Sequence, residues 1–485
     1  MSFFEISEQI LNNAFTENGD KAYKSTGSAC LDYFAIVGGM RFNIKDALNL
    51  FMKAYYEDPI IAIKLLFYVR DIRTGLGERN LFRLSFNALA NMYPNIAKQL
   101  IEYIPKYGRF DDLLVAIDTP IKKDIFEYFN KILKEDIENK KENKHISLLA
   151  KWLPSINTSS LETRDLANKV AVGLGMKKAD YRKMLSFLRE GLILENNLRE
   201  KDYSFDYDAV SGGAMMKYRS AFIKNDEERY FKYLDELKQG KSKINTNTIY
   251  PYEVLRKLRS QWSDKDVKAL DAVWNNFDRS KIDSKTIVVR DGSGSMCDNL
   301  PVCAIDVATS LALLFAEQLQ GPFKNKFITF SSEPKLVEVK GKTIFDKLKY
   351  MLTFSDWTDT NIQKVYQLII DVYKHNNFKP EDALDRIVII SDMEFNCLED
   401  NDQSTFEFIK NEFKKINKKM PELVFWNVRA RDVHFPTTNE NGVKLVSGSS
   451  AKTITMVTNN ETVNPYDFML SCLKNYNFVD ELSII

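Results

Sequence analysis

The sequence has few of the residues that build metal knuckles, disulfide frameworks and turn-rich folds. It contains 5 cysteines, with no Cys-x-x-Cys pair, and 3 histidines that lie far apart in 485 residues. This composition excludes a disulfide scaffold and a zinc knuckle, and it argues against a histidine-based metal or catalytic cluster. The 13 prolines and 19 glycines are few for this length. We therefore expect a helix-rich chain with few long loops.

An excess of one charge and a long apolar run are also missing. Lys and Arg number 68 against 67 Asp and Glu, a formal charge of +1, which argues against a uniformly basic nucleic-acid binder but leaves room for a local basic patch. The longest apolar run, around residues 308–316, is far shorter than the roughly 20 residues that span a bilayer. The first residues carry acids where a secretory signal would be basic. We expect an intracellular, cytoplasmic protein with no membrane partner.

The residues that are present follow two different periodicities. In residues 1–280, apolar positions recur at three- and four-residue spacing between short turns, which predicts a helical array or solenoid. From residue 281 to 485, β-branched runs are each followed by a helical segment, which predicts a doubly wound, parallel α/β domain. The predicted fold class is therefore α + α/β in two domains. The strand-like runs are residues 286–289, 327–330, 386–390 and 423–426, and a buried helix is expected at 302–318.

The strongest motif is Asp-Gly-Ser-Gly-Ser at residues 291–295, directly after a predicted strand. A carboxylate and two hydroxyls at alternate positions can direct their oxygens to one point, and oxygen is the ligand that hard divalent cations prefer. Two later loops, at residues 358–361 and 391–394, leave strand ends that face the same crevice in such a sheet. The alternative is a Gly/Ser turn beside ordinary acidic loops.

This arrangement resembles the von Willebrand factor A domain and its metal-ion-dependent adhesion site. The resemblance implies a metal set of Asp291, Ser293, Ser295, Thr360 and Asp392. It also implies an open coordination position that accepts an acidic side chain of a protein partner. We expect Mg²⁺ first, with Mn²⁺ and Ca²⁺ open because the same oxygens serve all three.

Arg290 departs from the family pattern, because an apolar residue is more usual at this strand position. If its side chain points into the sheet edge, it is harmless to the metal loop at residues 291–295. If it reaches the loop, it pairs with Asp291 or Asp392 and weakens cation binding.

Several segments of the first half resemble the TROVE module of Ro-type RNA-binding proteins, and more closely an uncharacterised family that joins a TROVE-like region to a von Willebrand A domain. Examples are Tyr-Val-Arg-Asp-Ile-Arg at 68–73 and Lys-Trp-Leu-Pro-Ser at 151–155. The resemblance covers roughly residues 40–475. It implies HEAT-like helix pairs in a ring or arc closed by the A domain, and for Ro-type proteins it implies binding of small structured RNAs. The other segments are 75–79, 104–113, 181–186, 214–219, 391–395, 424–429 and 442–448.

Basic side chains in the first half give independent support for RNA binding. Segment 151–200 has nine basic against six acidic side chains. Within it, Lys178, Arg182 and Arg189 share one helix face, and Arg79 and Arg83 form another pair four residues apart. Phosphate binding needs such stripes, with aromatics such as Tyr181 or Tyr218 nearby as stacking platforms. The alternative is an ordinary solvated helix face.

These observations leave three hypotheses for function. The first is a non-enzymatic RNA-binding scaffold whose A domain uses a divalent cation to bind an acidic partner. The second is a metal-dependent protein adaptor without RNA binding. The third is a hydrolase that activates water at the metal. No catalytic pair and no nucleotide-binding motif stand out in the sequence, so we expect no enzyme and no nucleotide cofactor.

Overall fold

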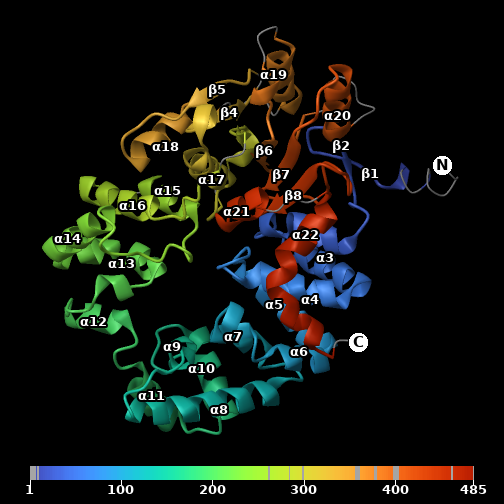
Figure 1. The fold of residues 1–485 in the computed structure, drawn as a ribbon. Coiled ribbons are helices and arrows are strands. Elements are labelled where there is room, and N and C mark those ends of the chain that lie inside the picture. Colours follow the sequence, from blue (N-terminus) through green and yellow to red (C-terminus); the bar gives the residue numbers. More distant parts are fainter. Residues whose placement is uncertain are drawn as a thin grey trace.

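The fold is a helical region combined with a predominantly parallel sheet, an α + α/β architecture (Figure 1). The computed structural model describes residues 7, 10–259, 263–282, 285–297, 300–331, 333–355, 361–375, 379–396, 404–459 and 463–483. In these ranges, no helix combines the length and the apolar character needed to cross a membrane.

Some helices of the first half begin at a side-chain cap, and most bury one apolar face. Asp58 caps α4 by accepting a hydrogen bond from the Ile61 N–H, and Ser160 caps α10 in the same way. Along α5, Leu81, Phe82 and further apolar residues at helical spacing are buried. The elements are α2 (Ala29–Ile36), η1 (Val37–Gly39), α3 (Ile44–Glu57), α4 (Pro59–Arg70), α5 (Arg79–Met92), α6 (Pro94–Leu100), α7 (Ile104–Tyr107), η2 (Phe110–Ala116), α8 (Lys122–Lys141), α9 (Leu149–Trp152), α10 (Leu161–Gly173), α11 (Lys178–Arg189), α12 (Leu194–Glu200), η3 (Tyr207–Ala209), α13 (Gly212–Asn225), α14 (Glu227–Lys238), α15 (Pro251–Arg259) and α16 (Asp264–Asn275).

The expectation of helices alone before residue 281 is wrong at its start. Strands β1 (Asn13–Phe15) and β2 (Lys21–Tyr23) form an antiparallel hairpin. The hairpin packs on the α/β part, because Tyr23 exchanges backbone hydrogen bonds of 2.9 Å with Phe435. Strands this short carry no periodicity that a sequence pattern can reveal.

The sheet of the second half has six strands in the order β5-β4-β3-β6-β7-β8. All pairs are parallel except β4 with β5, so the expected all-parallel sheet is corrected at this edge. The chain winds outward in one direction from β3 to β4 and in the other from β6 to β8, so the topological switch point lies between β3 and β6. The elements are β3 (Thr286–Asp291), η4 (Gly294–Met296), α17 (Ala304–Gln318), η5 (Gly321–Phe323), β4 (Lys326–Phe330), β5 (Leu336–Glu338), α18 (Ile344–Leu352), α19 (Ile362–Lys374), η6 (Pro380–Asp382), β6 (Arg386–Ser391), α20 (Thr405–Lys415), β7 (Glu422–Asn427), β8 (Val443–Ser447), α21 (Lys452–Asn459), α22 (Pro465–Leu473) and η7 (Lys474–Glu481).

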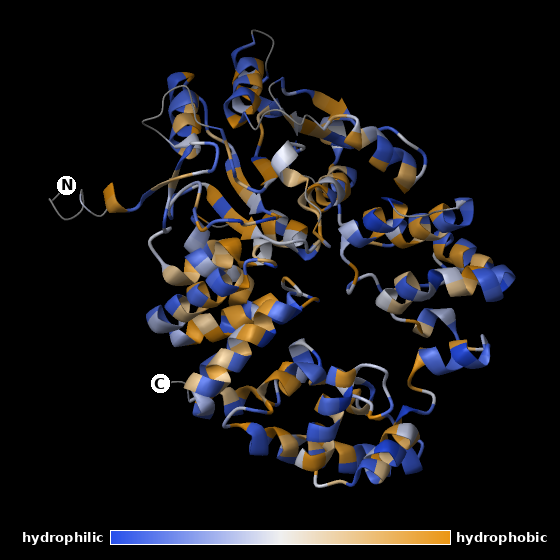
Figure 2. Cartoon of the chain, turned by 180° about the vertical axis from the view of Figure 1, so that it is seen from behind, coloured by the Kyte–Doolittle hydropathy of each residue, from blue (hydrophilic) through white to orange (hydrophobic). Residues whose placement is uncertain are grey.

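The helical region runs out from α5 and returns to its own beginning. In Figure 1 its ribbon passes through α8, α12 and α14 around an open centre, and Figure 2 shows the same course from behind. The two ends meet at Arg41, which pairs with Glu78 at 2.6 Å and donates a hydrogen bond of 3.1 Å to the Tyr252 hydroxyl. Tyr250 closes the same joint by donating to the Leu76 carbonyl at 2.9 Å.

The sheet joins this helical ring at both ends. Helix α15 packs on the apolar helix α17, and α2 packs on β8, where the Gly38 N–H donates to the Ser447 hydroxyl at 2.9 Å. A Cβ on Gly38 would lie 2.6 Å from the Gly448 nitrogen, so only glycine allows this approach. Helix α22 and η7 then return to pack against α4. In Figure 2 the strands and the helices on them carry much of the apolar colour, as expected for a shared core.

Candidate functional site

The first candidate site lies where β3 and β6 end beside each other, at the switch point of the sheet. Asp291 is the last residue of β3, and Asp392 directly follows β6. The Ser391 hydroxyl donates to Asp291 Oδ2 at 2.6 Å, and the Ser293 N–H donates to Asp291 Oδ1 at 2.9 Å. These bonds tie the loop after β3 to the end of β6 and bring both carboxylates to one edge of the sheet.

The hydroxyls of the metal loop point toward each other. Ser293 Oγ and Ser295 Oγ lie 3.0 Å apart across the start of η4. Four of the five residues in the expected metal set are thus gathered at one edge of the sheet. The fifth, Thr360, lies outside the described residues.

The electrostatics of this edge suit a cation. Asp291 is fully buried, and burial, followed by the negative charge of Asp392, raises the pKa of its carboxyl to about 7. Two carboxylates and two hydroxyls form an oxygen donor set of the kind that Mg²⁺ binds, and a cation there would relieve the repulsion between the acids. The residues present therefore fit the expected group.

Arg290 does not hydrogen-bond to either aspartate. Its guanidinium donates to Thr309 and Ser355, each at 3.3 Å, and to the Phe354 carbonyl at 3.0 Å. Burial lowers its pKa to about 10, and the nearby charge of Asp291 opposes this shift. Arg290 therefore forms neither of the expected ion pairs, although its guanidinium lies against the loop of residues 291–295: a Cβ on Gly292 would be 2.9 Å from Arg290 Nη2.

A different arginine, which the sequence analysis missed, pairs with the site. Arg431 Nη2 lies 2.6 Å from Asp392 Oδ2, and its Nη1 lies 2.7 Å from Glu17 Oε2. Arg431 follows β7, the strand next to β6, so its loop leaves the sheet at the same edge. The position of this loop, directly after a strand that neighbours β6, is the sequence feature that could have identified Arg431.

A cluster of carboxylates surrounds Arg431. Oxygens of Glu17, Glu394 and Asp432 lie within 4.8 Å of one another. Glu394 is buried, and its carboxylate lies 2.9 Å from the His434 ring. Burial acts to raise the pKa of the Glu394 carboxyl, but the hydrogen bond from His434 and the charge of that ring hold this pKa below its usual value. This cluster is acidic apart from Arg431 and His434.

The second candidate site is a cavity of about 910 Å³ on the inner side of the helical ring. Its walls come from α5, α9, α12 and α13, which all border the open centre in Figure 1. Five of the lining side chains are basic and two are acidic, and Trp152, Phe205 and Tyr218 add aromatic surface. The charged residues are Arg79, Arg109, Lys151, Arg189 and Lys217 against Glu195 and Asp206.

Two aromatic side chains of this cavity already carry cations. The Arg109 guanidinium lies 3.5 Å from the ring centre of Trp152, and the Lys217 ammonium lies 4.6 Å from that of Tyr218. The Arg79 side chain has no hydrogen bond or ion pair among the described residues. Desolvation and the positive charges of Arg109, Arg70 and Arg83 lower its pKa. Those three arginines pair with Asp111 and Asp112, so Arg79 is the member of this group that keeps no ion-pair partner among the described residues.

The basic residues singled out from sequence have different environments. Arg79 and Arg189 line this cavity together, and Arg182 lines an adjoining one of about 390 Å³ with Arg189. Arg83 instead pairs with Asp111 and with the buried Asp112, at 2.8 Å and 2.7 Å.

Local contacts also decide the roles of the remaining predicted residues. Arg189 donates to the Ala150 carbonyl at 2.8 Å, so it also holds α9 against α11. Lys178 is exposed at the first turn of α11 and lines neither cavity. Tyr181 is not a stacking platform, because it is fully buried and its hydroxyl donates to the Pro154 carbonyl at 2.8 Å.

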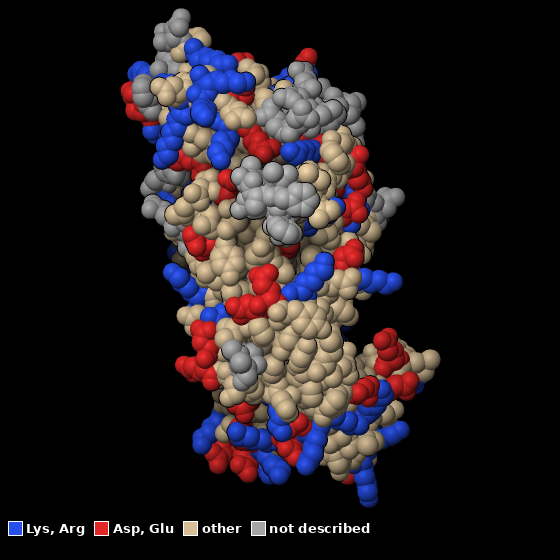
Figure 3. Space-filling model, turned by 90° about the vertical axis from the view of Figure 1, so that its right-hand side faces the viewer, with Lys and Arg blue, Asp and Glu red and all other residues tan. Residues whose placement is uncertain are grey.

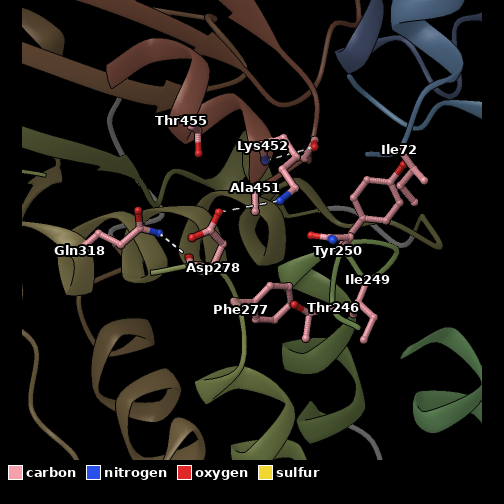
Figure 4. Close-up of a pocket in the computed structure, with 12 residues that line it drawn as sticks. Ile72, Thr246, Ile249, Tyr250, Phe277, Asp278, Gln318, Ala451, Lys452 and Thr455 are labelled. Carbon is pink, nitrogen blue, oxygen red and sulfur yellow. Dashed lines mark hydrogen bonds and ion pairs between the residues drawn. The ribbon is translucent and has the colours of Figure 1, made fainter. Parts of the chain in front are cut away.

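A third cavity lies at the joint between the ring and α21, and Figure 4 shows its lining. Its volume is about 30 Å³, room for a water molecule or two. Gln318 donates to the Asp278 carbonyl at 3.2 Å, and Lys452 lies 4.0 Å from the Asp278 carboxylate. These contacts are those of a structural joint.

One outer face of the molecule contrasts with the inner cavity. On the face seen in Figure 3, Lys and Arg gather mainly toward the two ends and alternate with acids, and the middle is largely uncharged. No continuous basic stripe crosses the described part of this face.

These features together define an α + α/β protein with an oxygen-rich sheet edge and a basic inner cavity. Comparison with known families matches residues 16–106 and 121–288, more than half of the chain, to the domain of unknown function DUF2828. Residues 285–474 match a second domain of unknown function, DUF7788. The chain belongs to the DUF2828 family.

Two known proteins illustrate the similarity. The uncharacterized protein L728 of Acanthamoeba polyphaga mimivirus is 32% identical over 517 residues, covering 96% of this chain and 88% of that protein. The crystal structure of the RO (RSR) protein of Deinococcus radiodurans superposes with a TM-score of 0.37 and 11% identity, covering 91% of this chain and 92% of that one. A superposition this loose carries no argument about fold or function.

Proposed function

We propose that the protein is a non-enzymatic RNA-binding scaffold of the Ro/TROVE type. In this proposal the helical ring binds RNA through its inner cavity. The α/β part is a von Willebrand A-like domain that holds a divalent cation. The observation that carries the proposal is the basic cavity, in which cations from several separate helices lie beside half-buried aromatic side chains.

The chemistry of this cavity suits a nucleic acid with unpaired bases. Phosphates need Lys and Arg, and Arg79 has no competing partner among the described residues. Unstacked bases bind on aromatic faces and on guanidinium planes, and Trp152 with Arg109 supplies both. A solvated helix face would expose its charges outward, whereas these side chains line one concave wall.

The cation part rests on the edge formed by β3 and β6. Asp291, Ser293, Ser295 and Asp392 would hold the ion, with Thr360 completing the set. A bound Mg²⁺ would supply a charge that an acidic side chain of a partner protein can ligate. Ser391 orients Asp291 for this purpose through its hydrogen bond of 2.6 Å.

The RNA proposal is tested first on protein purified from its native host in low salt with Mg²⁺. The 260/280 nm absorbance ratio, RNase treatment and sequencing should reveal a defined set of small RNAs. Clean protein without RNA would contradict the scaffold and favour a metal-dependent protein adaptor.

A point variant then tests whether the RNA binds in this cavity. Arg79→Gln should weaken binding of a single-stranded RNA roughly tenfold and should reduce the salt dependence of binding by about one counterion. The matched control is Lys123→Gln on α8, whose side chain is 87% exposed and does not line the cavity. Equal losses in both variants would contradict the assignment of this cavity.

A further inference from the structure

Arg431 is held from three directions. Its guanidinium contacts Asp392 at 2.6 Å and Glu17 at 2.7 Å, as described above. Its backbone carbonyl accepts a hydrogen bond of 2.9 Å from the Asn43 side chain at the start of α3. Contacts from the sheet edge, the N-terminal hairpin and the helical ring therefore converge on one residue.

The loop between β1 and β2 is bound firmly to the α/β part. We call residues 16–20 the strap. Thr16 donates to the Phe395 carbonyl at 2.7 Å, the Glu17 N–H donates to Glu394 Oε2 at 2.8 Å, and Asn18 donates to the Glu394 carbonyl at 2.7 Å. These bonds all reach the segment that follows Asp392, so the strap lies directly beside the candidate metal edge.

The strap also determines how Arg431 is held. Glu17 is the strap residue that contacts Arg431. Arg431 Nη1 donates to Glu17, and Nη2 of the same guanidinium donates to Asp392. A guanidinium held at both ends loses less freedom on pairing than a free one. If the strap lifts, Glu17 leaves and Arg431 keeps only Asp392 as an ion-pair partner among the described residues.

Arg431 and a divalent cation need the same carboxylate. Arg431 donates to Asp392 Oδ2, and Asp392 is one of the residues that would hold the proposed cation. Two positive charges at one carboxylate repel each other strongly where water is largely excluded, and Asp392 is only 1% exposed. Occupation by one therefore weakens the other.

We propose that Arg431 is a built-in competitor of the cation at Asp392 and that the strap holds this competitor in place. The inference rests on the cation site of the proposed function and adds its regulation. By linkage, whatever strengthens docking of the strap weakens cation binding, and a bound cation loosens the strap by the same factor. Cation binding at the sheet edge is thereby coupled to the N-terminal hairpin and, through Asn43, to the helical ring.

The test measures Mn²⁺ affinity by calorimetry on the full chain. Arg431→Gln should bind Mn²⁺ about tenfold or more tightly than the unaltered protein, and Glu17→Gln about threefold more tightly, because each removes part of the competition. Lys410→Gln is the control for charge alone, since Lys410 is exposed on α20 and pairs with Glu440. It should leave the affinity unchanged.

A second readout follows the strap itself. Saturating Mn²⁺ should speed amide hydrogen exchange of residues 16–20 in the unaltered protein, and Asp291→Asn should abolish this response. Glu17→Gln retains the Arg431 side chain but removes its contact with the strap, so it tests the same point if Arg431→Gln fails to fold.

The outcomes separate the two proposals. Mn²⁺ binding to the unaltered protein with no gain in Arg431→Gln and Glu17→Gln would overturn the competition and leave the cation site standing. No Mn²⁺ binding by any of these proteins would refute the cation site and the competition with it. A gain in Arg431→Gln that persists when Asp291→Asn is added would place the ion at Glu17, Glu394 and Asp432 and would also overturn the inference.

Discussion

Asp20, in the strap, is a carboxyl that folding removes from water. It is 3% exposed, and its Oδ2 accepts a hydrogen bond of 2.5 Å from the Thr405 hydroxyl. Burial raises its pKa from 3.8 to about 7, while Thr405, the Lys21 N–H and the charge of His434 act in the opposite direction. The folded protein therefore keeps a proton on Asp20 at pH values where the unfolded chain has lost it.

This proton makes stability fall as the pH rises. Between about pH 4 and pH 7 the native state binds more protons than the unfolded state at Asp20, so the free energy of unfolding decreases with pH in this window. Asp20→Asn should remove that slope and raise stability at pH 8 by about 1–3 kcal/mol. Urea unfolding at pH 5, 6, 7 and 8 measures it. Asp118→Asn, at an exposed pair with Lys169, should keep the original slope.

Single residues of the site were predictable where their position follows from a strand end. Asp291 and Asp392 were found in this way, because parallel strands that end together bring their next residues together. Arg431 was missed because its pairing depends on the fold of the loop after β7 and on contact with Glu17, far away in the sequence. Tyr181 was misjudged because an aromatic residue on a basic helix can face either the core or the solvent.

At the scale of one element, helix α16 depends on its first turn. Ser263 accepts a hydrogen bond from the Asp266 N–H, and the Asp266 side chain accepts one from the Ser263 N–H, a capping box. Asp266 also pairs with Arg219 of α13 at 2.8 Å. The cap therefore supports a contact between helices as well as the start of α16.

Loss of this cap should be measurable. Ser263→Ala should lower the free energy of unfolding by about 1 kcal/mol, because the N–H of Asp266 loses its side-chain acceptor. Ser211→Ala is the matched control, since Ser211 begins α13 without a side-chain capping bond. Urea denaturation compares the two, and an equal effect in both variants would contradict the role of the cap.

The sequence predicted best the helices and strands that are long and have a distinct apolar pattern. Helix α17 and strands β3, β4, β6 and β7 lie close to their expected positions, because buried apolar runs bounded by turns are distinctive. The edge strands β5 and β8 and the hairpin β1–β2 were missed. Three-residue strands are stabilised by their neighbours, and β8 is set by contact with β7 and α2.

At the scale of the whole molecule, a largely buried ion pair is among the contacts that join the two ends of the helical ring. The side chains of Arg41 and Glu78 are 14% and 8% exposed. The Arg41 guanidinium also lies over the rings of Tyr250 and Tyr252, 4.9 Å and 5.4 Å from their centres. These side chains join the first and last parts of the ring.

Breaking this pair should open the ring. Arg41→Leu leaves Glu78 buried without its cation, so we expect a loss of about 3–5 kcal/mol in stability. An increase in the radius of gyration measured by small-angle scattering should accompany it. Exposed pairs contribute roughly 0–1 kcal/mol, so Lys169→Leu should change neither quantity by much. A destabilised Arg41→Leu variant of unchanged radius would show that the ring stays closed without this pair.

The ring itself was expected only through the resemblance to the TROVE module. No sequence pattern predicts the contact between residues 41, 78 and 250–252. Closure of the ring joins segments about two hundred residues apart. It also depends on the summed angles between many helix pairs. Composition and periodicity define the helices and leave their path in space open.

The contact between Gly38 and Ser447 joins residues separated by 409 positions. A ribosome that has finished α2 must therefore add all the intervening residues before β8 exists to cover it. Throughout that time the part of α2 that packs on β8 is uncovered, although α3 and α4 already cover the rest, and nascent chains with uncovered apolar surface are prone to misassociate. The protein should depend on chaperones late in synthesis, and truncation before β8 should yield insoluble chains.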